Sequence, residues 1–274
     1  MASHAVDIEK GDRFAFGKNW SRFLSVVDDE RIFEAEQSLY EMLAMETLAG
    51  KSFLDIGCGS GLFSLAARRL GAHVHSFDYD PLSVACASEL KRRYFPSDDD
   101  WAIEEGSALD GQYLSSLSQF DIVYSWGVLH HTGRMWDAMA LAAERVSDGG
   151  TLFISIYNDQ GRKSKFWRRV KHTFCSGPIR RALVFGIFVP ALVSYGLVND
   201  IASGHNPFRR YREYKRKRGM SVYYDWIDWL GGYPFEVATP ERVVDFYSAR
   251  GFELRTSTTT ESHGTNQFVF TKED

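Results

Sequence analysis

The sequence predicts an α/β fold, in which helices cover both faces of a doubly wound, mostly parallel sheet. Between residues 51 and 157, short apolar runs typical of buried strands alternate with segments whose apolar residues recur at helical spacing. A glycine-rich stretch, Asp55–Gly61, joins the first strand to the first helix, and Asp78 ends the second strand. Short strand–helix–strand connections of this kind favour parallel pairing with right-handed crossovers. The carboxyl ends of the strands are therefore expected at one edge of the sheet.

Five strands are expected in this part of the chain, at Lys51–Ile56, His73–Phe77, Trp101–Glu104, Phe120–Ser125 and Thr151–Tyr157. The helices between them are expected at Leu62–Leu70, Pro81–Tyr94 and Trp136–Val146. Gly71 stands where a left-handed cap ends the first helix, and Pro81 suits the first turn of the second. The run Ser147–Gly150 is interpreted as the end of the third helix.

Two further helices and a closing pair of strands are expected outside this part of the chain. Glu30–Leu48 is amphipathic, and a short helix precedes it at Ser21–Leu24. Near the C-terminus, Thr239 caps a helix at Pro240–Gly251. The strands are expected at Phe252–Arg255 and Gln267–Thr271, each preceded by a glycine, as a hairpin-like pair.

Composition narrows the class of protein. The chain has 274 residues, of which 44% are hydrophobic and 25% charged, as is typical of a globular protein. Its three cysteines form no spaced cluster, so we expect no disulfide framework and no metal site. Residues 1–17 lack the apolar core of a signal peptide, and we expect a cytoplasmic protein.

The net charge of −4 conceals a strong asymmetry. Residues 162–218 hold 15 Lys and Arg but only two acidic residues, whereas the rest of the chain has 17 basic and 34 acidic residues. Within this basic region, Ala182–Val198 contains no charged residue, is short for a membrane span, and is interrupted by Gly186, Pro190 and Gly196.

The stretch Asp55–Gly61 carries the most specific signal. Its glycines allow a tight turn and a close approach of a ligand to the backbone, and the following helix begins with free N–H groups. A dinucleotide fingerprint would require glycine at position 62 or 64, where the chain has Leu62 and Ser64.

This spacing, with an acid two residues before the first glycine, resembles the first motif of class I S-adenosylmethionine (SAM)-dependent methyltransferases. The resemblance implies a seven-stranded sheet and SAM as the cofactor. It implies that Asp55, Gly57, Gly59 and Gly61 hold the methionine part of SAM, and that Asp78 holds the ribose. Ser107 and Ala108 would contact the adenine, although the family often has Asp where Ser107 stands. Tyr79 and Ser125 complete the predicted cofactor-binding residues.

His130 and His131 follow the fourth strand, in a stretch that resembles the part of the family that faces the methyl group. A neutral imidazole suits a general base, and adjacent residues rarely point the same way. We therefore favour His131 as the catalytic residue, with a structural histidine as the alternative.

The resemblance also implies a helical lid at residues 1–49, a SAM-binding core at 50–157, an insert at 158–235 and closing elements of the core at 236–274. Phe16, Asn19, Trp20 and Arg31 are the candidate lid residues. Residues interpreted as acceptor-binding are Trp20, Trp126, Tyr224, Asp225, Trp229 and Tyr233, with Trp226, Asp228, His263 and Asn266 as further candidates. Ordinary packing is the alternative for most of them.

Three interpretations of the insert remain open. It resembles the insert of ubiquinone-biosynthesis O-methyltransferases, which implies peripheral membrane contact through residues 162–218 and an amphiphilic acceptor. It could instead cap a soluble acceptor, or contact a second copy of the chain in a homodimer. Binding of nucleic acid is the least favoured, because the basic residues flank an apolar run and form no groove.

The sequence thus predicts an enzyme that moves a methyl group from SAM to an oxygen or nitrogen atom of a small or amphiphilic acceptor. An RNA-modifying methyltransferase, and a SAM-binding protein without methyl transfer, are the alternatives.

Overall fold

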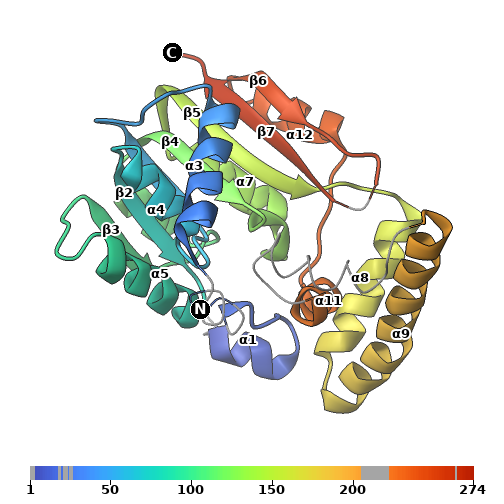
Figure 1. The fold of residues 1–274 in the computed structure, drawn as a ribbon. Helices are drawn as coiled ribbons and strands as arrows, with labels where there is room; N and C mark the ends of the chain where they lie inside the picture. The colour runs from blue at the N-terminus through green and yellow to red at the C-terminus, as the bar shows by residue number, and fades with distance from the viewer. Residues whose placement is uncertain (1–3, 18–19, 21–23, 25–26, 205–221, 263) are drawn as a thin grey trace.

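The computed structural model describes the chain except residues 1–3, 18–19, 21–23, 25–26, 205–221 and 263 (Figure 1). Its centre is one seven-stranded sheet with the order β3-β2-β1-β4-β5-β7-β6. The strands are β1 (Ser52–Ile56), β2 (His73–Asp78), β3 (Trp101–Glu105), β4 (Phe120–Trp126), β5 (Val146–Tyr157), β6 (Phe252–Thr258) and β7 (Thr265–Lys272). Strands β1 to β5 pair in parallel, and β7 runs antiparallel to both β5 and β6. The predicted seven-stranded, doubly wound sheet is therefore confirmed.

Helices cover both faces of the sheet, and its central strands β1, β4 and β5 are largely buried. One face packs against α3 (Asp29–Leu43), α4 (Leu62–Arg69) and α5 (Pro81–Tyr94). The other packs against α6 (Gly111–Ser116), α7 (Met135–Ala143) and α12 (Pro240–Ser248). Between them the two apolar layers hold most of the buried residues of the sheet. The sheet is thus a rigid support for the loops at its edge.

Several predicted boundaries need correction. The helix expected to end at Val146 ends at Ala143, and Val146 begins β5, where it pairs with Phe120. The run Ser147–Gly150 therefore lies in a strand and does not close a helix. The pairing jumps between Phe120 and Ile122, which marks a bulge that the local sequence does not reveal. The helix expected at Glu30–Leu48 ends at Leu43, before the left-handed Ala44. The short helix α6 was not predicted.

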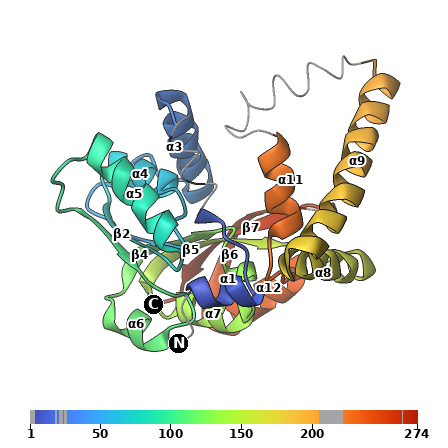
Figure 2. The ribbon, with the colours of Figure 1, turned by 90° about the horizontal axis from the view of Figure 1, so that it is seen from below.

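In the part of the chain that the structure describes, the insert after β5 has three helices beside the carboxyl ends of the strands (Figure 1). They are α8 (Arg162–Cys175), α9 (Pro178–Ala202) and α11 (Val222–Gly231). Contrary to the predicted interruptions, α9 is one helix that continues through Gly186, Pro190 and Gly196. Aromatic contacts join α8 to α9, because Phe188 lies 6.2 Å from Phe166 and 5.6 Å from Trp167 between ring centroids. The far end of α9 extends away from the sheet (Figure 2).

A third apolar cluster connects the N-terminal residues to the insert. Phe14 packs with Val170 and Phe174 of α8, Val184 of α9 and Leu230 of α11. Before Phe14, the helix α1 (His4–Lys10) lies near the end of β2, where Asp7 accepts a hydrogen bond from Tyr79 at 3.1 Å. We call residues 4–17 the N-terminal strap, because they run from the loop after β2 to the insert. This contact between distant parts of the chain places the strap across the edge of the sheet at which β1, β2 and β4 have their carboxyl ends.

Candidate functional site

The functional edge lies at the carboxyl ends of β1, β2 and β4. Strand β1 is flanked by β2 on one side and β4 on the other, so the crossovers on its two sides run in opposite directions. A crevice opens at such a switch point, and ligands of open α/β sheets bind there. The loop after β1 has positive φ at Gly57 (76°), Gly59 (55°) and Gly61 (81°). Such angles favour glycine, so these three positions of the loop carry no side chain.

Asp78, at the end of β2, is held beneath this loop. Its Oδ2 accepts a hydrogen bond from the Gly59 backbone N–H at 2.9 Å, and its Oδ1 accepts one from the Asp80 N–H at 2.8 Å. Burial raises the pKa of Asp78 to about 6, although both N–H donors and the charge of Arg13 oppose this shift. The carboxylate is therefore fixed in position at the crevice.

Asp55, in β1, is fixed by a chain of buried donors. The indole of Trp101 donates to the Ser76 hydroxyl at 2.9 Å, and Ser76 donates to the Ser64 hydroxyl at 2.8 Å. Ser64 in turn donates to Asp55 Oδ2. Burial raises the pKa of Asp55 to about 7, and the nearby negative charge of Asp78 contributes to the rise. Two buried carboxyl groups thus flank the glycine loop in a region that would gain from a cationic ligand.

The other predicted cofactor-binding residues have structural contacts at the same edge. The Ser125 hydroxyl donates to the Ile56 carbonyl at 3.0 Å and so links β4 to β1. Ser107 accepts a hydrogen bond from the Leu109 N–H at 3.2 Å, and Ala108 packs beside it. Tyr79 donates to Asp7 of the N-terminal strap at 3.1 Å. Tyr79 follows Asp78 directly, and the Gly106 N–H, next to Ser107, donates to the Asp78 carbonyl at 3.0 Å. The roles of these residues in cofactor binding stay predictions.

His131 lies in the short 3-10 helix η1 (Leu129–His131) after β4. Its Nδ1 is 2.6 Å from the carbonyl oxygen of Pro234, which follows a cis peptide bond. Because a carbonyl oxygen can only accept, Nδ1 carries the proton and Nε2 carries the lone pair. Burial lowers the pKa of His131 to about 3, and the charges of Lys171 and Arg13 lower it further. The ring is therefore neutral at physiological pH, with Nε2 as a hydrogen-bond acceptor.

His130 is fully buried and packs against other rings. Its centroid is 4.1 Å from that of Tyr157 at the end of β5 and 4.5 Å from that of His131. Burial lowers its pKa well below the ordinary value. Tyr157 also contacts Phe235, at 5.1 Å, and Trp229, at 6.2 Å. We call these residues, with His131, the aromatic cluster.

Lys171 is a buried cation at the border of the aromatic cluster. Its ammonium donates to the Trp229 carbonyl and lies 4.2 Å from the Trp229 ring centroid and 5.0 Å from that of Phe235. Lys171, Tyr157 and Phe235 were not among the predicted site residues. Tyr157 could have been found, because it ends a parallel strand at the functional edge. No sequence feature distinguishes Lys171 from the many other basic residues of the insert.

The predicted acceptor-binding residues divide into three groups. Trp229 belongs to the aromatic cluster, and the Tyr233 ring instead packs against His172 at 5.1 Å. Trp126 is 44% exposed and stacks on Phe63 at 6.4 Å, outside the cluster. The side chains of Tyr224, Asp225 and Asp228 in α11, like His263, lie outside the described residues. Asn266 donates to Asn158 at 3.2 Å and accepts from the Thr260 N–H, which joins two loops.

The N-terminal strap closes over this edge. The Gly17 N–H donates to Asp80 Oδ2 at 2.8 Å, and the His4 ring lies 3.4 Å from the same oxygen. Arg13 donates to the His131 carbonyl at 3.2 Å, and Phe16 packs on the His131 ring at 5.0 Å.

The predicted lid residues behave differently from one another. Besides Phe16 on His131, the Trp20 ring lies about 3.2 Å from where a Cβ on Gly59 would stand. Arg31 pairs with Asp28 at the start of α3. Asn19 lies outside the described residues. Among the described residues, no group of three or more His, Cys, Asp or Glu has the arrangement of a metal site.

Comparison with known proteins gives a consistent picture. Residues 29–184 match the family described as a methyltransferase domain. The mitochondrial ubiquinone biosynthesis O-methyltransferase of Schizosaccharomyces pombe is 28% identical over 160 residues, which cover 56% of each chain. The ubiquinone biosynthesis O-methyltransferase of Nitrosococcus oceani is 31% identical over 121 residues, 41% of this chain and 46% of that protein. The chain thus spans about half the length of these curated relatives.

Solved structures share the fold at low sequence identity. Magnesium protoporphyrin IX methyltransferase from Synechocystis PCC 6803 with bound S-adenosylhomocysteine (SAH) superposes with a TM-score of 0.54 at 13% identity, over 93% of this chain and 95% of that one. The N-methyltransferase NodS from Bradyrhizobium japonicum WM9, also with SAH, gives a TM-score of 0.51 at 13% identity, over 95% and 100% of the two chains.

Proposed function

Because the chain belongs to the methyltransferase-domain family, we propose that it transfers the methyl group of SAM to an oxygen or nitrogen atom of a small or amphiphilic acceptor. The observation that carries this proposal is the arrangement of Asp55, Asp78 and the glycine loop at the switch point of the sheet. The two relatives above are named as O-methyltransferases, which favours oxygen as the acceptor atom.

The residues at the crevice fit SAM in shape and charge. SAM carries a sulfonium, an ammonium group and a ribose diol. Asp78 lies at the end of β2, where its carboxylate can accept the ribose hydroxyls. Asp55 and Asp78 are both buried with raised pKa values, so a cationic ligand would relieve their electrostatic cost. The glycine loop, which has positive φ at Gly57, Gly59 and Gly61, and the start of α4 border the place proposed for the methionine part.

The bound sulfonium would supply an activated methyl group for an in-line displacement. The protein's task is then to align the acceptor and to receive its proton. We assign the second task to His131, whose Nδ1–H is engaged by Pro234 and whose Nε2 can accept. As the acceptor atom bonds to the methyl carbon it gains positive charge, and its proton becomes acidic enough for a weakly basic imidazole. During transfer, the Nε2 lone pair of His131 would receive that proton.

The N-terminal strap is proposed as the lid of this site, within the predicted lid region 1–49. Phe16 of the strap packs on the His131 ring, and Trp20, which follows the strap in the sequence, lies close to Gly59. The strap and Trp20 together would thus cover the proposed acceptor position and the cofactor loop. Its polar contacts with Asp80, Tyr79 and the His131 carbonyl lie at the rim. Closure would exclude water from the transfer site, and release of the strap would admit the ligands.

Contact with a membrane surface is proposed for α8 and α9. Of the helices that the structure describes, α9 alone is long and apolar enough to cross a membrane by length and composition, and only 11% of its most apolar window is buried. Its exposed apolar side chains recur along one face: Ile179, Leu183, Ile187, Val198 and Ile201. The adjacent α8 carries exposed basic residues, among them Arg162, Lys163 and Arg169. An apolar face beside basic side chains fits a helix that lies in the interface of an anionic membrane.

The proposed function is tested by methyl transfer to a cell extract. Purified protein is incubated with methyl-labelled SAM, and the lipid, aqueous and nucleic-acid fractions are separated. Label in the lipid fraction would identify an amphiphilic acceptor, and label in the aqueous fraction a soluble one. Label in nucleic acid that ribonuclease releases would support the alternative of RNA modification.

A further inference from the structure

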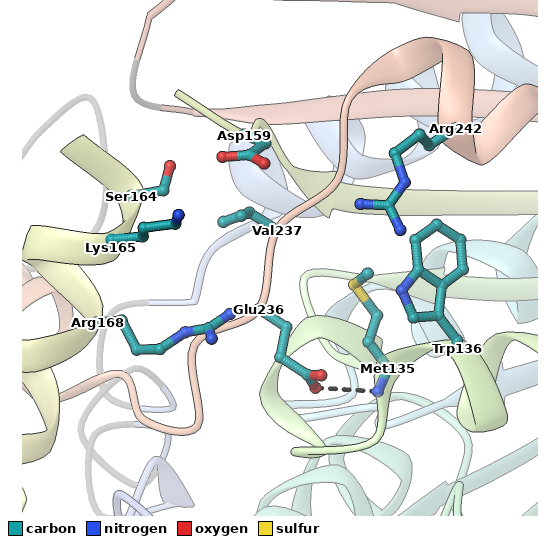
Figure 3. A pocket seen from close by; sticks show the side chains of 9 residues that line it. All are labelled: Met135, Trp136, Asp159, Ser164, Lys165, Arg168, Glu236, Val237 and Arg242. Atoms are coloured by element: carbon teal, nitrogen blue, oxygen red, sulfur yellow. Dashed lines mark hydrogen bonds between the residues drawn. The ribbon is translucent and has the colours of Figure 1, made fainter. Parts of the chain in front are cut away.

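A cavity outside the proposed transfer site opens between α8, α12 and the start of α7 (Figure 3). Its volume is about 230 Å³. Pockets for whole small-molecule ligands usually measure about 300–1,000 Å³, so this one suits a compact group at the end of a larger molecule. An open groove adjoins it, because Trp136 and Arg242 line both, with Asp245 and Phe246 added on the groove side.

The segment from Pro234 to Ala238 separates this cavity from the aromatic cluster. On its inner side, the Pro234 carbonyl accepts from His131 and the Phe235 ring packs on Tyr157. Glu236 and Val237 of the same segment line the cavity. A ligand in the cavity would therefore not compete with the acceptor for the same atoms.

Three cationic side chains border the cavity: Lys165 and Arg168 from α8, and Arg242 from α12. Arg168 donates through Nε to the Phe235 carbonyl at 3.0 Å, which holds its guanidinium at the border. Arg242 lies 5.1 Å from the Trp136 ring centroid. Within the part of the chain that the structure describes, no carboxylate lies at ion-pair distance from the head groups of Lys165 and Arg242.

Two carboxylates also line the cavity, but backbone groups engage them. Asp159 Oδ1 accepts from the Gly161 N–H at 2.8 Å. Glu236 Oε2 accepts from the Met135 N–H at 2.9 Å, which is the dashed line in Figure 3. Both acids thus stabilise the turns that form the cavity. We therefore expect the cationic head groups to be the side chains that bind a ligand.

We propose that this cavity binds the phosphate group of an organic phosphate ester. Arginine offers a planar fork that matches phosphate oxygens, and lysine adds a compact charge, so the set Lys165, Arg168 and Arg242 suits a phosphate bordered on three sides. The Trp136 ring, which packs at 5.0 Å from Phe246, provides an apolar wall for the organic part along the groove. The phosphate ester is either a phospholipid head group or a soluble metabolite.

The test is calorimetric titration of the full chain with glycerol phosphate at low ionic strength, without SAM or acceptor. Lys165→Gln and Arg242→Gln should each weaken binding roughly tenfold, because each removes a charged hydrogen bond to the phosphate. The matched controls are Lys163→Gln, an exposed lysine on the same helix, and Arg255→Gln, an exposed arginine of β6. Both controls should bind as the unsubstituted chain does. No binding at millimolar glycerol phosphate, or equal weakening by the controls, would overturn the proposal.

Vesicles distinguish the two sources of phosphate. Co-sedimentation is compared for phosphatidylcholine vesicles with and without phosphatidylglycerol. If the pair of substitutions Lys165→Gln and Arg242→Gln abolishes the preference for phosphatidylglycerol, the phosphate belongs to a lipid head group. If the preference persists while glycerol phosphate binding is lost, the ligand is a soluble phosphate ester. Since the calorimetric reading requires no methyl transfer, it stands or falls independently of the proposed function.

Discussion

The two buried carboxyl groups at the glycine loop differ in what surrounds them. Asp78 accepts from two backbone N–H groups, whereas Asp55 accepts from the Ser64 hydroxyl and has the negative charge of Asp78 nearby. Asp78 is accordingly the position at which a ribose would be held, and Asp55 is the position at which a negative charge is least stable without a cationic ligand.

Asp78→Ala should weaken SAM binding by roughly tenfold or more, because it removes a charged acceptor of the ribose hydroxyls. Calorimetry with SAM measures the dissociation constant directly. The control is Asp137→Ala, since Asp137 is an exposed acid paired with Arg134 on α7. If the dissociation constant for SAM is unchanged in Asp78→Ala, Asp78 is not the acceptor of the ribose hydroxyls.

Asp55→Asn should stabilise the ligand-free protein at neutral pH. The pKa of Asp55 rises from 3.8 to about 7 on folding, so the folded state binds the proton more tightly than the unfolded state. This carboxyl group therefore lowers the stability of the protein progressively as pH increases from about 4 to about 7. Thermal melting should show that the advantage of the Asn variant grows over this range and levels off above pH 7. An advantage that shrinks with increasing pH would contradict the reasoning.

His131→Asn should reduce kcat and leave the affinity for SAM unchanged. The Asn amide can still donate to the Pro234 carbonyl, but it lacks the Nε2 acceptor of the imidazole. Removal of a general acid or base typically costs about 100-fold or more in rate. His73→Asn, an exposed histidine at the opposite edge of the sheet, is the control. Full activity in His131→Asn would assign the residue to packing alone.

At the scale of elements, local sequence patterns predicted most of the helices and strands that form the core. The helix α5 has the predicted bounds, because Asp80 caps its first turn and Pro81 fits that turn. The predicted end of α7 and the predicted start of β5 were wrong. The pairing of Val146 with Phe120 joins residues that no local sequence pattern relates. In α9, Pro190 and two glycines were read as interruptions, yet the apolar run forms one helix. A proline removes one hydrogen bond from a helix, and the remaining bonds and contacts sustain it here.

The apolar face of α9 gives a prediction for the membrane. Leu183→Glu combined with Ile187→Glu should abolish co-sedimentation with anionic vesicles, because both side chains are more than half exposed, at 60% and 64%. Since they are exposed, the substitutions should leave the melting temperature nearly unchanged. Phe33→Glu, at a side chain on α3 that is 58% exposed, is the control for a lost surface apolar group. Binding that survives the α9 substitutions would exclude this face as the membrane contact.

At the scale of the whole molecule, the strap joins parts of the chain that the sequence does not relate. Gly17 bonds to Asp80 across 63 positions, and Arg13 bonds to His131 across 118. The resemblance implies a lid at the N-terminus. Phe16 packs on the His131 ring, Trp20 lies close to Gly59, and Arg31 makes a capping contact with Asp28 in α3. Their role as lid residues stays a prediction. Long-range contacts of this kind depend on the tertiary fold and leave no local periodicity.

Loosening the strap should speed the release of SAM. Asp7→Asn combined with His4→Gln removes a charged acceptor from the contact with Tyr79 and the imidazole ring from the contact with Asp80, and neither residue lies in the glycine loop. Stopped-flow measurement should show a faster dissociation of SAM with little change in its association. The control Glu9→Gln alters an exposed acid of the same helix. An unchanged dissociation rate would show that the strap does not retain the cofactor.

The central claim is that the functional edge binds SAM and passes its methyl group to an acceptor. The most direct measurement is the release of SAH and the movement of label from methyl-labelled SAM into an extract fraction, compared between the unsubstituted chain, Asp78→Ala and His131→Asn. The account predicts label in the lipid or aqueous fraction for the unsubstituted chain, little label for either variant, and retained SAM affinity for His131→Asn. Tight binding of SAM with no SAH and no label in any fraction would contradict it.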